Sequence, residues 1–446
     1  MNTYIFSPEA KRFCIKGIIA GLIIFLVGVG INWNFGKDNG HHVAEAGTHT
    51  EHLLAEANSH SDVHYEGDES VAKEIQSDPT HHTATLKTLV ISNVYIIVQY
   101  AYWIGLAALF FLSATTLALG GWHIQVQKSI LAIAGTLPYS IATLILFFAL
   151  FSHDLFHWTD SSLYVQGGPN FDLALFTKHD YLNLTRFWIF AILMFGISLA
   201  INYYWNKNLK EMDENPSVKL FDNSRKIAAV SIVLIAMVIN PFGSWDWAMS
   251  IQPHWFSTMF SWNLFASASV AMFAITVLIV LYLKKADYLQ KVNANHFHNI
   301  GLYMFAITIF WAYTWFSQYM LIWYANIPEE TIYFSKRMNG YAELFYLSLI
   351  FNFAIPFLVL MTRDSKRRVG PLLGMGVLLI IGHYIDFFNM MVPELVPHGG
   401  FGLVGIGALV FIASIFGYIT LNTLSKYKDL ESSTHPYIKE SYEHQI

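Results

Sequence analysis

Titratable side chains sit in one unusually aromatic stretch of the chain, PFGSWDWAMSIQPHWFSTMFSWN, which covers residues 241–263. Asp246 and His254 lie there among four tryptophans, Trp245, Trp247, Trp255 and Trp262. Tryptophan favours the headgroup level of a bilayer, where its ring is buried and its N–H stays hydrated. An acid and an imidazole in such a belt can exchange protons close to water. The alternative is an interfacial turn without a chemical role.

Charged residues inside apolar runs are the next candidates, because each costs about 2.5–3.5 kcal/mol at the bilayer centre unless it is paired or hydrated. Arg186, Glu343 and Asp386 fall inside such runs. His383 precedes Asp386 by three positions, so the two share one face of a helix. A buried carboxylate beside a histidine can relay protons. For this pair and for Glu343 the alternative is a helix–helix hydrogen bond that fixes packing.

A third group ends an apolar run in the sequence SHDLFHW. His153 and His157 are four residues apart, on one face of a continuing helix, with Asp154 between them. Arg186 begins the next run and could pair with Asp154 or with Asp180. Such a group at a membrane surface could orient a quinol head group and accept its protons, or it could be an ordinary interfacial ion pair.

Metal ligation is not expected from this chain. Its single cysteine, Cys14, leaves no internal disulfide, cysteine-ligated zinc site or cysteine-held iron–sulfur cluster to be built. The apolar runs hold no pair of histidines at matched depth and the chain has no CxxCH motif, so an intrinsic haem is not expected either.

The composition indicates a membrane protein. Of the 446 residues, 54% are hydrophobic and only 13% are charged, against about 25% in a soluble domain. The net charge of −5 does not show the basic excess that is typical of nucleic-acid-binding proteins. Ten apolar runs are long enough to cross a bilayer as helices, which predicts an all-α integral membrane protein with about ten transmembrane helices. They lie near residues 15–34, 92–119, 129–152, 181–205, 226–245, 256–283, 299–324, 338–361, 370–392 and 401–424.

The distribution of Lys and Arg predicts the orientation. Most of the 26 basic residues flank alternate loops on one side of the ten runs, the side that also holds both ends of the chain. By the positive-inside rule residues 1–14 and the tail 425–446 are cytoplasmic. Residues 241–263 and the loops joining runs seven to eight and nine to ten then lie at the outer face. The first run has no A-x-A-like cleavage site after it and is read as a retained helix.

The loop after the first run, residues 36–88, is expected at the outer, periplasmic face. It is polar and aperiodic, which predicts a solvated loop. Its histidines are irregularly spaced, so pH buffering is favoured over a specific metal site. They are His41, His42, His49, His52, His60, His64, His81 and His82.

Three motifs together resemble one family: SWDWAMSIQPHWFSTMF (244–260), WYANIPEETIYFSKR (323–337) and HYIDFFNMMVPEL (383–395). They are similar to the second large membrane subunit of alternative complex III, a bacterial quinol:cytochrome c oxidoreductase, within the broader NrfD-like or polysulfide-reductase-membrane-subunit family. The resemblance covers roughly residues 10–430. It implies two four-helix bundles, residues 92–245 and 256–392, flanked by the first and tenth helices.

The resemblance also implies a cellular location, a substrate and partner subunits. The chain would lie in the bacterial inner membrane, bind no redox centre itself and act on quinol or menaquinol, with haem c and iron–sulfur clusters in partner subunits. Those partners would be a homologous membrane subunit, multihaem cytochrome c and iron–sulfur subunits, small membrane subunits and a terminal oxidase, besides lipids. Quinol and proton-transfer candidates are His153, Asp154, His157, Arg186, Asp246, His254, Glu343, His383 and Asp386.

Two other classes compete with this interpretation. A secondary transporter or ion channel also has ten or more spans with sparse buried charges, although it often carries interrupted helices near the midplane. A purely structural membrane scaffold would use every polar group for packing. The charges here lie toward one face and no interrupted pair of helices is evident, which favours the subunit of a respiratory complex.

Overall fold

The computed structural model describes residues 3–33 and 85–444, so the eight histidines of the loop after the first run lie outside the described residues. In the described ranges every regular element is helical, and ten helical stretches are long and apolar enough to cross a membrane. The predicted all-α fold with about ten transmembrane helices is confirmed. The chain is a multi-pass integral membrane protein.

In the described ranges, ten spans follow one another along the chain. They are α1 (Pro8–Ile31), α4 (Leu86–Leu117), α5 and α6 (Gln127–Ala134, Leu137–Leu155), α8 (Leu184–Glu214), α9, η4 and α10 (Val218–Leu234, Ile235–Ile239, Asn240–Trp247), α11 (Met259–Lys285), α12 (Ala294–Ala325), α14, η6 and α15 (Ala342–Leu349, Ile350–Ala354, Ile355–Leu360), α16 (Val369–Leu395) and α17 (Leu403–Leu424). Shorter helices are η1 (Gly121–Gln125), η2 (His157–Thr159), η3 (Ser161–Tyr164), α7 (Leu173–Lys178), η5 (Met249–Ile251), α13 (Pro328–Gly340) and α18 (Ile438–Tyr442).

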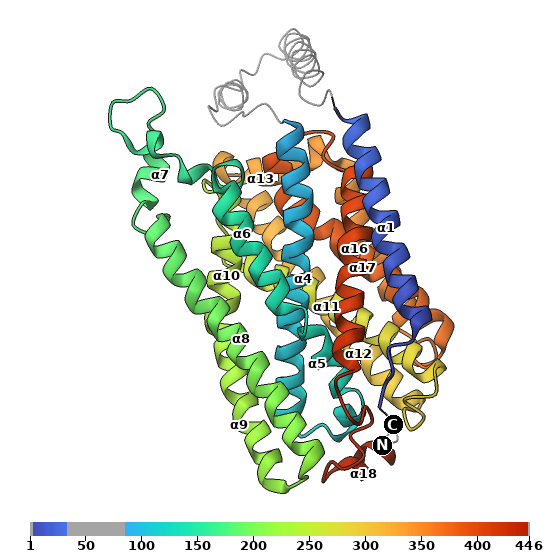
Figure 1. The fold of residues 1–446 in the computed structure, drawn as a ribbon. Helices are drawn as coiled ribbons and strands as arrows, with labels where there is room; N and C mark the ends of the chain where they lie inside the picture. The colour runs from blue at the N-terminus through green and yellow to red at the C-terminus, as the bar shows by residue number, and fades with distance from the viewer. Residues whose placement is uncertain (1–2, 34–84, 445–446) are drawn as a thin grey trace.

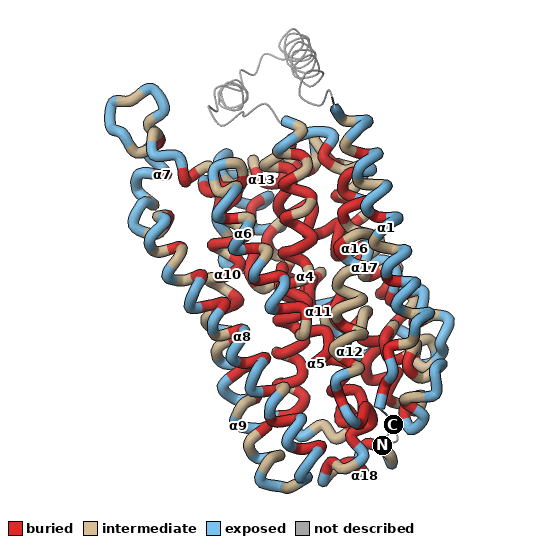
Figure 2. The backbone as a smooth tube through the Cα atoms, viewed as in Figure 1, coloured by how far each residue is buried: buried red, intermediate tan, exposed pale blue. Residues whose placement is uncertain are grey.

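Two four-helix bundles meet along α4 and α11, the most completely buried spans (Figure 2). The first bundle consists of α4, α5–α6, α8 and α9–α10, and the second of α11, α12, α14–α15 and α16. Both helices at the centre are apolar on all sides, as a helix surrounded by other helices must be. The two flanking helices lie together, because α1 packs along α17 and α17 packs on α4 and α5.

Two spans share the same local distortion. A π-helical segment occupies Ile235–Ile239 in one and Ile350–Ala354 in the other, and each is followed at its second position by a proline, Pro241 or Pro356. Proline cannot donate an N–H to the preceding turn and its ring crowds that turn's carbonyl, so the helix widens locally. Both spans nevertheless stay helical throughout, so the expectation that no broken pair of helices exists is not contradicted.

Both described ends of the chain lie at one end of the bundles, here called the termini end, and α7 and α13 lie at the other, here called the α13 end (Figure 1). The tail, residues 425–444, packs across the termini end. Lys128, 1% exposed, binds Asp213 with nitrogen–oxygen distances of 2.6 and 2.9 Å and also donates to the carbonyl of Asp429. On the second bundle Asn295 donates to the His444 carbonyl at 2.9 Å. The tail therefore joins the two bundles.

Glycines set the contact between α1 and α17. A Cβ atom at Gly21 would overlap the backbone of Phe411, whereas Gly30 on the same helix faces open space. We predict that Gly21→Ala lowers the free energy of unfolding by about 1–3 kcal/mol, because the helices must separate. The check is thermal unfolding in detergent, with Gly30→Ala as the matched control that leaves the midpoint unchanged. An equal effect of both substitutions would contradict the close contact.

Two buried histidines should make docking of the tail pH-dependent. Burial lowers the pKa of His123 and of His435 to about 4, and His435 also faces His123 and Lys128. Because the released side chains take up protons at pH values near 6.5, docking should weaken as the pH falls from about 6.5 toward 4 and be strongest above that range. Proteolysis of the tail against pH measures this, and His435→Gln should flatten the profile. An unchanged slope in that variant would remove His435 from the effect.

Candidate functional site

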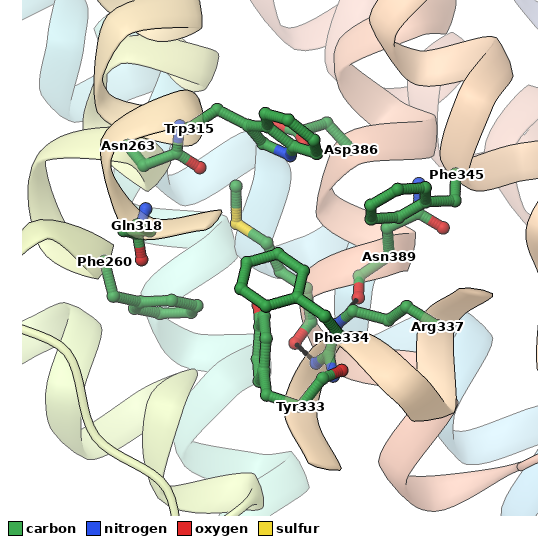
Figure 3. Close-up of a pocket in the computed structure, with 11 residues that line it drawn as sticks. Phe260, Asn263, Trp315, Gln318, Tyr333, Phe334, Arg337, Phe345, Asp386 and Asn389 are labelled. Atoms are coloured by element: carbon green, nitrogen blue, oxygen red, sulfur yellow. Dashed lines mark hydrogen bonds between the residues drawn. The ribbon is translucent and has the colours of Figure 1, made fainter. Parts of the chain in front are cut away.

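A small cavity lined by both aromatic and polar side chains lies inside the second bundle near the α13 end (Figure 3). Helices α11, α12, α13, α14 and α16 all contribute to it, and Asp386 and Arg337 line different sides of the same space. The volume that the centre of a water-sized sphere can occupy inside it is about 20 Å³. This is room for about one ordered water. A quinol head group would fit only after the walls move apart. The other residues that line it are Phe260, Asn263, Trp315, Gln318, Tyr333, Phe334, Phe345, Asn389 and Met390.

Asp386 is a buried acid held by a neutral donor. The indole N–H of Trp311 donates to its Oδ2 at 2.8 Å, and Asp386 forms no ion pair with the described residues. His383 lies one turn away on the same side of α16, where its Nδ1 and the Ser267 hydroxyl are 2.9 Å apart. The other ring nitrogen, Nε2, is buried without a hydrogen-bond partner in the described part of the chain. The prediction that His383 and Asp386 share a face is consistent with this geometry.

Arg337 is the residue that the sequence reasoning missed. It is 2% exposed, and it donates from Nε to the Asn389 carbonyl at 2.7 Å and from Nη1 to the Tyr333 carbonyl at 2.5 Å. Its guanidinium lies 3.3 Å from the centre of the Tyr333 ring. Burial lowers its pKa, while Tyr333 and Glu394 act against that shift. No local pattern signalled its burial, because the carbonyls of Asn389 and Met390 that hold it come from α16.

In the first bundle Arg186 has a different partner from the one expected. It pairs with Asp246, with 3.0 Å between Nη1 and Oδ1, and the Tyr181 hydroxyl donates to the same oxygen at 3.0 Å. The prediction that Arg186 pairs with Asp154 or Asp180 is wrong. Asp154 instead binds Lys87 at 2.7 Å. The reason is that α10 brings Asp246, distant in sequence, against the start of α8.

The two clusters are built alike. In each, an arginine packs its guanidinium on a preceding tyrosine and donates to that tyrosine's carbonyl; Arg186 lies in the first turn of the span α8, and Arg337 lies in the short helix α13 that precedes the span α14–α15. In each, an aspartate comes from the fourth span of the bundle. The two clusters differ in the contact between aspartate and arginine. Asp246 forms an ion pair with Arg186, whereas Asp386 and Arg337 form no direct ion pair.

The histidines of SHDLFHW do not share a helical face. Helix α6 ends at Leu155 after a non-helical residue at Phe151, and His157 begins the separate turn η2. His153 is exposed and hydrogen-bonds the Thr159 hydroxyl at 2.9 Å. The expected i,i+4 arrangement is therefore wrong, because the helix stops between the two residues.

His254 lies on the surface and fastens a loop. Its Nε2 is 2.5 Å from Oδ2 of Asp172, and its side chain is 41% exposed. Burial acts to raise the pKa of Asp172, but the Leu175 N–H and His254 outweigh it and lower the pKa. Since Asp172 also caps α7, this pair connects α7 to the tryptophan-rich stretch.

Two of the four tryptophans are core residues instead of an interfacial belt. Trp247 is 2% exposed and packs on Phe187, with ring centres 4.8 Å apart, and Trp255 stacks on Tyr333 at 3.7 Å. Trp255 thereby supports the tyrosine on which Arg337 rests. The stretch thus helps to build the interior of both clusters.

Glu343 does not belong to a buried site. It is exposed near the beginning of α14, which starts at Ala342 after the chain turns at Tyr341. The sequence placed the start of this span near residue 338, which set Glu343 deeper in the helix than it is. The expectation of a buried carboxylate at this position is therefore wrong.

Comparisons with known proteins found no match: no protein-family model and no curated protein matches the chain. Among the described residues, no group of three or more His, Cys, Asp and Glu side chains is placed to hold a metal ion.

The Arg186–Asp246 pair should be important for stability. We predict that Asp246→Asn lowers the free energy of unfolding by about 3 kcal/mol, because a mostly buried guanidinium loses its charge partner. Chemical or thermal unfolding in detergent measures the loss. The control is Glu211→Gln, which removes the exposed partner of Lys207 at 4.0 Å and should change stability by less than about 0.5 kcal/mol. Equal losses in the two variants would contradict a special role for the buried pair.

Proposed function

We propose that the protein is an integral subunit of a respiratory quinol:cytochrome c oxidoreductase complex in the bacterial inner membrane. In this complex it contributes a proton path and, with its partners, a quinol site, while haem c and iron–sulfur clusters reside in other subunits. The observation that carries the proposal is the buried Asp386–His383 pair beside the cavity that Arg337 also lines. The three motifs that resemble alternative complex III include all three of these residues.

The chemistry assigned to the cavity is proton transfer. Oxidation of a quinol releases protons that must leave the membrane interior, and a carboxyl group within reach of an ordered water can accept and pass them on. Asp386 faces the cavity and His383 lies one turn deeper with an unused ring nitrogen, so the two can act in sequence. Arg337 supplies a fixed positive charge that favours the ionised form of a nearby acid.

The first-bundle cluster receives a different role. Asp246 is engaged by both Arg186 and Tyr181, so accepting a further proton would break a buried ion pair. We therefore assign Asp246 to structure and Asp386 to proton exchange. The orientation that follows from the basic loops would place the α13 end, and thus the entrance to this path, at the periplasmic face.

One observation favours a second candidate, a secondary transporter. Transporter sites often lie where two spans depart from the regular α-helix near the membrane midplane, and the π-helical segments η4 and η6 are two local departures of a milder kind. Asn352, fully buried in η6, donates to the Gly382 carbonyl at 2.9 Å, directly beside His383. A transporter would use this region for a solute, whereas the respiratory subunit would use it for protons alone.

The Asp386 carboxyl should be essential for turnover. We predict that Asp386→Asn, in the assembled complex, lowers quinol:cytochrome c turnover by about tenfold or more, because an amide cannot carry the proton. Stopped-flow or steady-state reduction of cytochrome c in native membranes measures this. The matched control is Glu343→Gln, an exposed carboxylate of the same bundle, which should leave turnover unchanged.

The outcomes separate the three classes. Normal turnover of assembled Asp386→Asn would remove the proton path and leave a scaffold role. A protein that purifies from mild detergent without multihaem or iron–sulfur partners, and without quinone, would contradict the respiratory complex and favour the transporter.

A further inference from the structure

A second and larger cavity lies at the termini end of the first bundle, beneath the tail. The volume that the centre of a water-sized sphere can occupy inside it is about 210 Å³. A single water requires far less. The end of α4, η1, the first turns of α9 and the tail all line it. Two aromatic rings form one wall: Phe221 and Tyr437, with centres 4.8 Å apart. None of the residues assigned to proton transfer belongs to it.

The charges that line this cavity are of both signs. Arg225 brings a guanidinium, and Asp222 and Glu440 bring carboxylates. Arg225 and Asp222 are only loosely paired, at 3.7 Å, with side chains 47% and 55% exposed. Both therefore remain able to bind another molecule at the cavity mouth.

The deeper wall is polar but uncharged near neutral pH. Burial lowers the pKa of His123 and of His435 to about 4, so both rings are neutral there. The His123 Nε2 is 3.3 Å from the Thr116 hydroxyl. The net charge of the lining is thus set by one arginine and two carboxylates, which suits a ligand that carries a phosphate and an amine together.

The cavity lies beside the ends of two membrane-spanning helices. The span α4 ends at Leu117 and the span that contains α9 begins at Val218. Leu119, which lines the cavity, is 58% exposed, and Val218 is 54% exposed. Exposed apolar side chains beside a charged cavity at this level provide a place for the first carbons of an acyl chain.

We propose that this cavity binds the phosphoethanolamine head group of a zwitterionic phospholipid. Arg225 would bind the phosphate, for which a guanidinium has matching geometry. Glu440 and Asp222 would bind the ammonium group, with the Phe221 and Tyr437 rings beside it. An anionic head group without an amine would leave the two carboxylates unneutralised. This inference is independent of the proposed respiratory function.

The test is lipid retention measured by native mass spectrometry. The full-length protein is reconstituted in nanodiscs of phosphatidylethanolamine or of phosphatidylglycerol. It is then released from the nanodisc in the mass spectrometer by raising the collision energy in steps. We expect wild type to retain phosphatidylethanolamine, and Arg225→Gln to weaken that retention by about tenfold. The matched control is Arg368→Gln at the termini end, whose arginine is 74% exposed and lies 4.0 Å from Asp364. It should retain the lipid as wild type does.

Competition identifies the source of the head group. Free phosphoethanolamine that displaces the lipid only at far higher concentration supports a lipid site, whereas equal affinity for the free compound would overturn the lipid assignment in favour of a soluble ligand. Equal retention of phosphatidylglycerol, or undiminished retention by a folded Arg225→Gln variant, would overturn the proposal. Thermal unfolding of each variant establishes that it is folded.

Discussion

The cost of placing charge inside a helical bundle governs how this protein is built. An ionised group removed from water must find an opposite charge or several oriented dipoles, and the chain solves this in three ways. Lys128 binds a carboxylate and a backbone carbonyl from two distant segments. Arg186 binds a carboxylate and packs on an aromatic ring. Arg337 donates to backbone carbonyls and packs on an aromatic ring. Each solution fixes the relative position of helices that are far apart in sequence.

The regions around these three cations differ in whether a carboxylate is paired directly with the cation. Around Lys128 and Arg186 the charges are neutralised within the protein, so neither region gains from a further ion. The Arg337 region differs, because Asp386 lies across a small cavity without touching it. A carboxyl group and a guanidinium that do not touch leave room for a water between them, whereas a direct ion pair does not. The two bundles thus hold one aspartate that is paired with an arginine and one that lines a cavity without such a pair.

The sequence was sufficient for properties that depend on local pattern. Ten apolar runs predicted the spans, and the spacing of His383 and Asp386 predicted their common side of α16. Predictions failed where they needed tertiary contacts or helix ends. The partner of Arg186 depends on how α10 approaches α8, and His153 and His157 were separated by the end of α6. Arg337 looked like an ordinary loop charge because its burial depends on carbonyls of α16, which no local pattern reveals.

The pairing of α1 with α17 has a consequence for biogenesis. Gly21 and Gly407 allow the backbones of the first and last spans to meet, and α1 has its main contacts with α17. Among the described spans α1 is the first and α17 the last along the chain, so their contact can form only after every described helix between them has been synthesised.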